Sequence, residues 1–243
     1  MAKRITAGVA RPMYVVGPAD LKQNGGRWGI QGGPAVAVFN LGESGQSTKF
    51  GDVLNGNYAE FEANGFLVFY GSARAWIDFN FGVNALTRGA AAPDLITVPG
   101  TGIQTIGFNG VNTLEQVSVG MELNHNWAEG TLLYPHVHWA PTTTAAGDVV
   151  WYLEIGYTHA GVFVDLGTLS VTQAAGGVAW SEQYVAFPAI STPGLTIGTQ
   201  IAARFYRDPT IGADDYGADA ALTFSFGFHV LIDTLGSRLQ ATK

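Results

Sequence analysis

Apolar and polar residues alternate with a period of two through much of the chain beyond residue 57, which is the pattern of half-buried β-strands. In ARAWIDFNFG, residues 73–82, the alternation places Trp76, Asp78 and Asn80 on one face and apolar side chains on the other. No segment keeps a 3.6-residue apolar period over a dozen residues. We therefore expect little helix.

Turn residues divide this pattern into short strands. YAEFE and FLVFYG flank Asn64-Gly65, a dipeptide that tolerates the positive φ of a tight hairpin turn. The strand-like runs that follow are IQTIGF, LEQVSVGMELN, TLLYPHVHW, VVWYLEIGYTH, GVFVDLGTLSV, VAWSEQYVAF, TQIAARFYRD and ALTFSFGFHVLID. Roughly eight to ten such strands predict an all-β fold, an antiparallel β-sandwich that is jelly-roll-like and occupies residues 57–243.

Residues 1–56 differ from the rest, because short apolar patches alternate there with glycine-rich stretches such as NGGRWG. Segments of this kind bury little area of their own. The sequence predicts an extended glycine-rich N-terminal arm that becomes ordered on other subunits, with disorder in solution as the alternative. The arm residues expected to contact partners are Arg11, Met13, Tyr14, Val15, Trp28 and Phe39.

The composition is short of charge. Charged residues make up 13% of the 243 residues, half of the ~25% usual in soluble domains, while 47% are hydrophobic and 33 are glycine. The shortage predicts a surface covered by neighbouring subunits. A net charge of −7 without clustered Lys and Arg argues against a nucleic acid partner. We expect no membrane partner either, because no apolar run is long enough to span a bilayer.

Two histidines one residue apart, His136 and His138 in EGTLLYPHVHW, are the candidate metal ligands. Strand alternation puts both on one face, about 7 Å apart, and the spacing from Gly130 to His136 matches the opening of the cupin motif. Cupins then place a glutamate three or four residues beyond the second histidine, where this chain has Thr142 and Thr143. A third ligand would have to come from Glu154, His159 or His229. We therefore expect no metal and no cofactor, and interpret the pair as packing or interface residues.

An acidic loop, RDPTIGADDYGADA (residues 207–220), is a second candidate site. It contains Asp208, Asp214, Asp215 and Asp219. Oxygen ligands close together can bind calcium, but the spacing does not fit an EF-hand. We expect a solvated hairpin loop, with calcium binding as the alternative.

Motifs of common catalytic sites are absent. The sequence has no G-x-S-x-G elbow, no phosphate-binding glycine loop and no pair of carboxylates singled out by spacing. Several tryptophans that could stack on sugars lie inside strand patterns, where core or interface packing is expected. They are Trp76, Trp127, Trp139, Trp151 and Trp180. We expect no enzymatic activity; the alternative is a cupin-like metalloenzyme that uses His136 and His138.

Four blocks stand out together: GSARAWIDF (71–79), EGTLLYPHVHW (129–139), VVWYLEIGY (149–157) and YGADAALTFSFGFHVLIDTLGSR (216–238). In this order they resemble a group of tailed-bacteriophage and prophage structural proteins. In that group a G-D-A-T-x-W-x-D-like strand, an E-G-S-x-x-x-P-H-x-H-W strand, a W-x-L-E-Y strand and a terminal H-x-x-x-D-T-L-G-S-R recur. The first block departs from the pattern, with Gly-Ser-Ala-Arg in place of Gly-Asp-Ala-Thr, so no role is carried over for that acidic residue.

The resemblance covers roughly residues 57–238 and implies a virion component of the head or neck. It implies a non-enzymatic capsid decoration or cement protein, which binds the major capsid protein on the outer capsid surface and stabilises the head. The alternative is a neck, collar or tail-fibre component. By analogy with decoration proteins we expect a homotrimer. No catalytic residue comes with the resemblance.

Overall fold

The computed structural model describes backbone and side chains for residues 47–111, 113–158, 161–220 and 225–239. For residue 159 and residues 221–224 it describes the backbone, and within residues 1–46 it describes the backbone of five short strands. The chain divides into two compact units, Met1–Ala75 with Ile232–Gln240 and Trp76–Leu231 with Ala241–Lys243.

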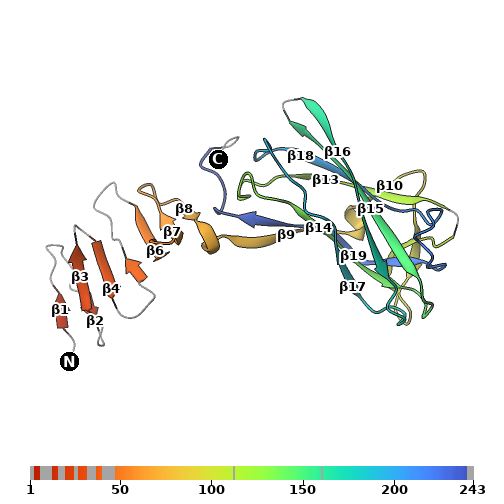
Figure 1. The fold of residues 1–243 in the computed structure, drawn as a ribbon, viewed down its shortest axis with the longest axis horizontal. Helices are drawn as coiled ribbons and strands as arrows, with labels where there is room; N and C mark the ends of the chain where they lie inside the picture. The colour runs from red at the N-terminus through yellow and green to blue at the C-terminus, as the bar shows by residue number, and fades with distance from the viewer. Residues whose placement is uncertain are drawn as a thin grey trace. The chain divides into compact units, whose positions relative to one another are not determined.

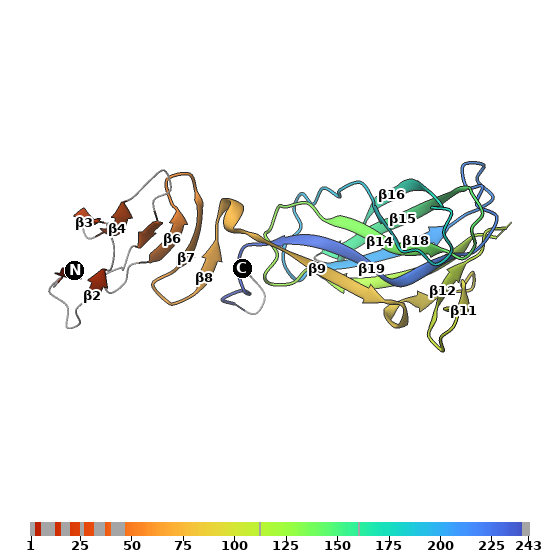
Figure 2. The ribbon, with the colours of Figure 1, turned by 90° about the horizontal axis from the view of Figure 1, so that it is seen from below.

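The larger unit is a sandwich of two antiparallel sheets (Figures 1 and 2). One sheet has the order β10-β13-β18-β15-β16, whose strands are Thr87–Arg88, Glu115–Glu122, Gln200–Arg207, Asp148–His159 and Val162–Ala174. The other has the order β11-β12-β19-β14-β17, with strands Asp94–Thr97, Gln104–Phe108, Ala220–Ile232, Tyr134–Pro141 and Gln183–Ala186. A further strand of this second sheet, β9 (Ala75–Gly82), pairs with β19. The chain passes repeatedly from one sheet to the other, so the predicted jelly-roll-like β-sandwich is confirmed.

The core between the two sheets is built from large aromatic rings. Trp151 stacks on Phe205 with ring centroids 4.9 Å apart and meets the edge of Phe108 at 5.3 Å. The indole N–H of Trp139 donates to Gln173 at 2.7 Å. Core packing is thus confirmed for Trp127, Trp139 and Trp151, which have no exposed area. Trp76, by contrast, is 57% exposed.

Strand alternation agrees with the burial of β9. Ile77, Phe79 and Phe81 pack against the core, while Trp76, Asp78 and Asn80 are exposed on the opposite face. This confirms the two faces predicted from the sequence, because successive side chains of a strand point to opposite sides of its sheet.

The acidic loop after β18 is tied into the fold at its central aspartate. The side chains of Arg207 and Asp214 have no exposed area and form an ion pair of 2.7 Å. Other N–H groups of Arg207 donate to three main-chain carbonyls, those of Phe108, Ala218 and Tyr216. Asp214 also accepts from the main-chain N–H of Val150 at 3.0 Å. The expected solvated loop is therefore wrong for Asp214, because this carboxylate neutralises a buried guanidinium.

The neighbouring aspartates of this loop also have local partners. Asp215 accepts a hydrogen bond of 2.6 Å from the main-chain N–H of Asp148. Asp208 accepts from both the main-chain N–H and the hydroxyl of Thr210. These carboxylates thus serve separate hydrogen-bond donors and do not converge on one point.

The smaller unit contains three small antiparallel sheets. They are β1-β2 (Lys3–Ile5 and Met13–Val15), β3-β4-β5 (Asp20–Asn24, Arg27–Gln31 and Ala37–Phe39) and β6-β7-β8 (Thr48–Asp52, Asn57–Phe61 and Leu67–Phe69). Of the arm residues expected to contact partners, Arg11 lies outside the described residues. The same holds for the side chains of Met13, Tyr14, Val15, Trp28 and Phe39.

The hairpin predicted around Asn64-Gly65 is confirmed. β7 pairs with β8, Gly65 has φ +83°, and the Asn64 side chain accepts from the main-chain N–H of Phe66 at 2.9 Å. The predicted boundary between residues 56 and 57 falls in the turn that joins β6 to β7. β6 pairs with β7 along its full length. The two compact units divide between Ala75 and Trp76.

Helix is confined, within the described residues, to two 3₁₀ turns, η1 (Gly71–Ala73) and η2 (Val83–Ala85). This agrees with the lack of a helical period in the sequence. Neither of these described turns has the length or the apolar character needed to cross a membrane.

Candidate functional site

The strand β14 presents two chemically different faces. Val137 and Trp139 point into the core and have no exposed area, whereas Tyr134, His136 and His138 lie on the outer face of the sheet. Both predicted histidines therefore share a face, as strand alternation requires. Their neighbours on that face come from β19, which pairs with β14 and with β9.

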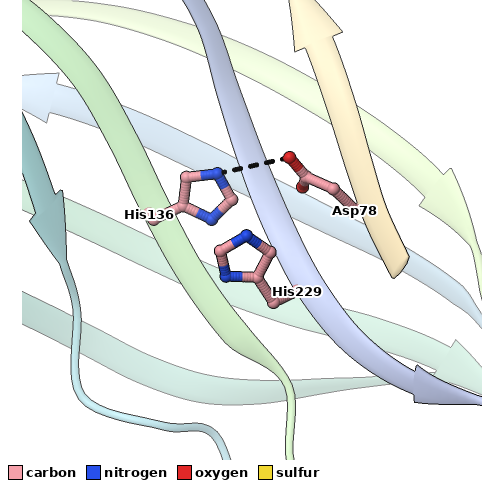
Figure 3. Close-up of side chains that lie close together, drawn as sticks. All are labelled: Asp78, His136 and His229. Carbon is pink, nitrogen blue, oxygen red and sulfur yellow. Dashed lines mark ion pairs between the residues drawn. The ribbon is translucent and has the colours of Figure 1, made fainter. Parts of the chain in front are cut away.

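A cluster of three side chains lies on this outer face, one from each of these strands (Figure 3). Asp78 comes from β9, His136 from β14 and His229 from β19. One ligand atom from each lies within 4.8 Å of the other two, and within the described residues this is the one group of three or more His, Asp or Glu side chains that meets this distance. The Nε2 of His136 lies 3.7 Å from the Oδ2 of Asp78. The rings of His136 and His229 stack at 4.2 Å with 20° between their planes.

A glycine makes room for the cluster. Gly227 on β19 is the register partner of His136, and Tyr134 is the partner of His229. A Cβ added at Gly227 would lie 2.8 Å from the Cε1 of His136 and 2.9 Å from the Oδ1 of Asp78. Because the glycine has no side chain, the His136 ring lies across β19 toward Asp78.

His136 is the buried member of the cluster. Its side chain has no exposed area, while 36% of the Asp78 side chain is exposed. Among the described residues neither ring nitrogen of His136 has a hydrogen-bond partner. Burial lowers the pKa of His136; the carboxylate of Asp78 acts in the opposite direction and His229 adds to the lowering. The main chain of Tyr134 also favours the imidazolium, but it forms no hydrogen bond of ordinary geometry with the ring.

His138 belongs to a different contact. Its Nδ1 lies 2.7 Å from the Oε1 of Glu182, and its ring meets the His136 ring edge-on at 5.4 Å. The two histidines proposed from the sequence therefore lie side by side without forming one ligand set. His136 is grouped instead with His229 and Asp78.

Three residues were considered as a third ligand, and among those with a described side chain one reaches His136. His229 stacks on it. Glu154 lies on β15 of the other sheet and forms an ion pair of 2.6 Å with Arg204. The side chain of His159 lies outside the described residues.

Asp78 is the member that sequence reasoning missed as a ligand. Alternation correctly places it on the polar face of its strand, but nothing local indicates that β9 pairs with β19. One signal was present: Asp78, His136 and His229 each fall in one of the four blocks that carry the phage-protein resemblance. The three blocks occupy β9, β14 and β19.

Aromatic side chains surround the cluster on the same face. Trp76 meets Tyr134 edge-on at 5.2 Å, and Tyr184 on β17 lies 5.4 Å from the His136 ring. Partial burial, with a contribution from Asp78, raises the pKa of Tyr184. Trp76 and Tyr184 are 57% and 48% exposed, so the cluster is bordered by rings that remain in contact with solvent.

The five-stranded sheet carries a separate depression of about 430 Å³. Its charged lining residues are Glu154, Asp165 and Arg204. Glu154 and Arg204 are joined by their ion pair, and the guanidinium of Arg204 also donates to Gln116 at 2.8 Å.

No family model matches the sequence. No curated protein matches it either.

Solved structures give weak likenesses. One is the CBM36-1 domain of a multidomain xylanase from the hindgut metagenome of Trinervitermes trinervoides, with 15% identity and a TM-score of 0.38 over 63% of this chain and 96% of that one. Another is the Clostridium thermocellum xylanase 10B CBM22-1–GH10 modules in complex with xylohexaose, with 10% identity and a TM-score of 0.34 over 64% of this chain and 28% of that one. A third is TmCBM61 in complex with β-1,4-galactotriose, with 10% identity and a TM-score of 0.30 over 65% of this chain and 88% of that one. At these TM-scores we draw no functional conclusion from the likeness.

Proposed function

We propose that this chain is a non-enzymatic structural protein of a tailed-phage virion, a decoration or cement protein that binds the major capsid protein on the outer surface of the head. The observation that carries the proposal is the arrangement of the blocks that resemble phage structural proteins. Three of them, dispersed between residues 71 and 238, form β9, β14 and β19. These are neighbouring strands of one sheet.

The surface of the described residues supports a protein that works in an assembly. Fourteen large hydrophobic side chains are exposed, and only 13% of the chain is charged. Val162 and Phe163, which are 62% and 61% exposed, lie at the start of β16, a strand at the edge of the five-stranded sheet. Exposed apolar groups and unpaired strand edges favour contact with other chains.

Such a protein would use its apolar surface on the capsid shell and on copies of itself. An interface of standard size buries about 1,600 Å², which a sandwich face or a strand edge with its flanking loops can provide. We expect a homotrimer placed about local threefold axes of the head, because symmetric shells present such positions to closed oligomers.

The test is reconstitution on heads. Capsids assembled without this protein are incubated with purified full-length chain, sedimented and imaged by cryo-electron microscopy. We expect saturable binding with hundreds of copies per head and a higher temperature of head disruption. About six to eighteen copies located at a tail or neck ring would replace decoration by a collar or fibre role, because ring symmetry sets those counts.

Two outcomes would remove the proposal. One is a purified chain that does not co-sediment with heads at any concentration tested, together with virions that lack the protein and keep their full heat and osmotic resistance. The other is turnover of a substrate by the purified chain that is lost in a point variant of its outer face.

A further inference from the structure

We propose that Asp78, His136 and His229 form a binding site for a divalent first-row transition-metal ion, such as Zn²⁺, on the outer face of the six-stranded sheet. The ion would join β9, β19 and β14 at one point. It would hold these strands together and keep one coordination position open to solvent, independent of what the protein binds in an assembly.

The kinds of ligand select the class of metal. Two imidazoles and one carboxylate are a common set for zinc and for other first-row divalent ions. Magnesium and calcium prefer sites made of oxygen ligands. Three protein ligands leave a fourth position of a tetrahedral ion for water, on the side where Asp78 reaches solvent.

The distances are close to those of a metal site before the metal draws its ligands together. Ligands about 2.0–2.1 Å from a tetrahedral ion lie about 3.3 Å from each other. The Nε2 of His136 and the Oδ2 of Asp78 are 3.7 Å apart, and all three ligand atoms fit within 4.8 Å. The two rings are nearly parallel, so the partly exposed His229 would turn about χ2 to aim a nitrogen at the ion bound by His136.

The burial of His136 is an independent observation that points to a ligand. Its side chain has no exposed area, and neither ring nitrogen has a hydrogen-bond partner in the described part of the chain. Buried polar groups of native proteins nearly always have a partner, and an exception calls for an explanation such as an ion. In Figure 3 the Nε2 edge of the His136 ring points toward Asp78, and the ring of His229 is stacked beside it.

Gly227 supports the same conclusion from the backbone. Its missing side chain leaves the space in which the His136 ring approaches Asp78. A simple ion pair would also occupy this space, but at 3.7 Å the two groups are not hydrogen-bonded. A metal between them would contact both groups at bonding distance.

The first experiment measures metal binding to the full-length protein after removal of metals with a chelator. Zn²⁺ is titrated by calorimetry, and Co²⁺ is added as a spectroscopic probe of the ligand geometry. We expect one Zn²⁺ per chain, a rise of the melting temperature with Zn²⁺, and visible absorption of four-coordinate Co²⁺. Absence of saturable Zn²⁺ binding at millimolar concentration would overturn the proposal.

Variants separate this site from the His-x-His pair. Replacing even an outer partner of a metal ligand costs about 10–100-fold in affinity, so His229→Gln and Asp78→Asn should each weaken Zn²⁺ binding by about 100-fold or more. His138→Gln is the matched control, because His138 lies on the same strand face but contacts Glu182. Its affinity for Zn²⁺ should fall by less than the roughly 10-fold that loss of an outer partner costs, because His138 is neither a proposed ligand nor hydrogen-bonded to one.

The opposite pattern, loss in His138→Gln with no loss in His229→Gln, would show that the site is the sequence pair and that the proposed ligand set is wrong. Circular dichroism and melting in chelator check that each variant folds. If His229→Gln does not fold, Asp78→Asn still decides the matter, because Asp78 is exposed and asparagine has the same shape. An unchanged Zn²⁺ affinity in Asp78→Asn would show that Asp78 is not a ligand, and the proposal would then be wrong.

Discussion

Arg207 and His136 are both polar side chains without exposed area, yet their surroundings differ completely. Arg207 donates five hydrogen bonds, two to the carboxylate of Asp214 and three to main-chain carbonyls. His136 has none within the described residues, and its closest charged neighbour, Asp78, is 3.7 Å away. A guanidinium has five N–H donors, so the first group is fully satisfied and the second is not.

The difference indicates two kinds of burial. A charge that is paired and completely hydrogen-bonded is part of the folded structure, and breaking it costs much of the stability of a domain. A buried polar group without partners lowers stability unless something else supplies the partner. We therefore assign the Arg207 cluster to folding and the His136 cluster to binding.

Arg207→Met should cause the greatest loss of stability. Removal of the guanidinium leaves the carboxylate of Asp214 buried without its partner, which costs about 3–5 kcal/mol in such pairs. Urea unfolding should show the loss as a lower midpoint. The control is Arg204→Met, whose partner Glu154 is 42% exposed, so the change should stay below about 1 kcal/mol. Equal losses in the two variants would contradict the assignment of Arg207 to folding.

The next effect is that of Gly227→Ala. The new methyl group would overlap His136 and Asp78 at 2.8–2.9 Å, and such overpacking costs about 1–3 kcal/mol. Gly120→Ala on β13 is the control, because the nearest atom to its added Cβ is 3.8 Å away. The free energies of unfolding of the two glycine variants are compared by denaturant unfolding in the presence of chelator. A Gly227→Ala protein as stable as the control would mean that the His136 ring is not held against β19.

A smaller effect of opposite sign is expected for His136→Phe in the absence of metal. The ring contact with His229 is kept, and the buried nitrogens without partners are removed. We expect the free energy of unfolding to rise by about 1 kcal/mol, measured in chelator. With Zn²⁺ added, the wild type should regain the difference while the variant does not. A clear loss of stability in chelator would show that His136 is already satisfied in the folded protein.

The smallest effect concerns Glu115, which lies beside the Arg207 cluster. Burial is the main cause that raises its pKa above 4.5, and Asp94 and Asp219 add to this; the N–H of Asn109 and the charge of Arg207 act in the opposite direction. A raised pKa in the folded state means that the folded protein binds the proton more tightly than the unfolded chain. The wild type should therefore gain stability relative to Glu115→Gln as the pH falls from 7 toward 4.5. A difference that stays constant over this range would contradict the raised pKa.

Local patterns were enough for the elements of the fold. The two faces of β9 followed from alternation, and the β7–β8 turn followed from Asn64-Gly65. Burial of Trp139 and Trp151 followed from their positions within strands. These predictions succeed because the period of a strand and the conformations of glycine and asparagine are properties of a few consecutive residues.

The candidate site could be predicted only in part. His136 was recognised from the His-x-His spacing, but its neighbour in sequence, His138, turned out to contact Glu182. The other members of the cluster are far from His136 in the chain: Asp78 lies 58 residues before it and His229 lies 93 residues after it. Strand pairing joins these positions, and pairing between distant strands leaves little trace in a single sequence.

The all-β character, the tight turns and the polar or apolar sides of the strands could be predicted from the sequence, because these depend on short-range geometry. The sequence also carried the resemblance on which the proposed role in a virion is based. The folded structure was needed to find that Asp214 neutralises Arg207 inside the fold and that Asp78 and His229 meet at His136. Electrostatic and metal-binding contacts depend on distance in space, and the order of the strands across a sheet sets that distance.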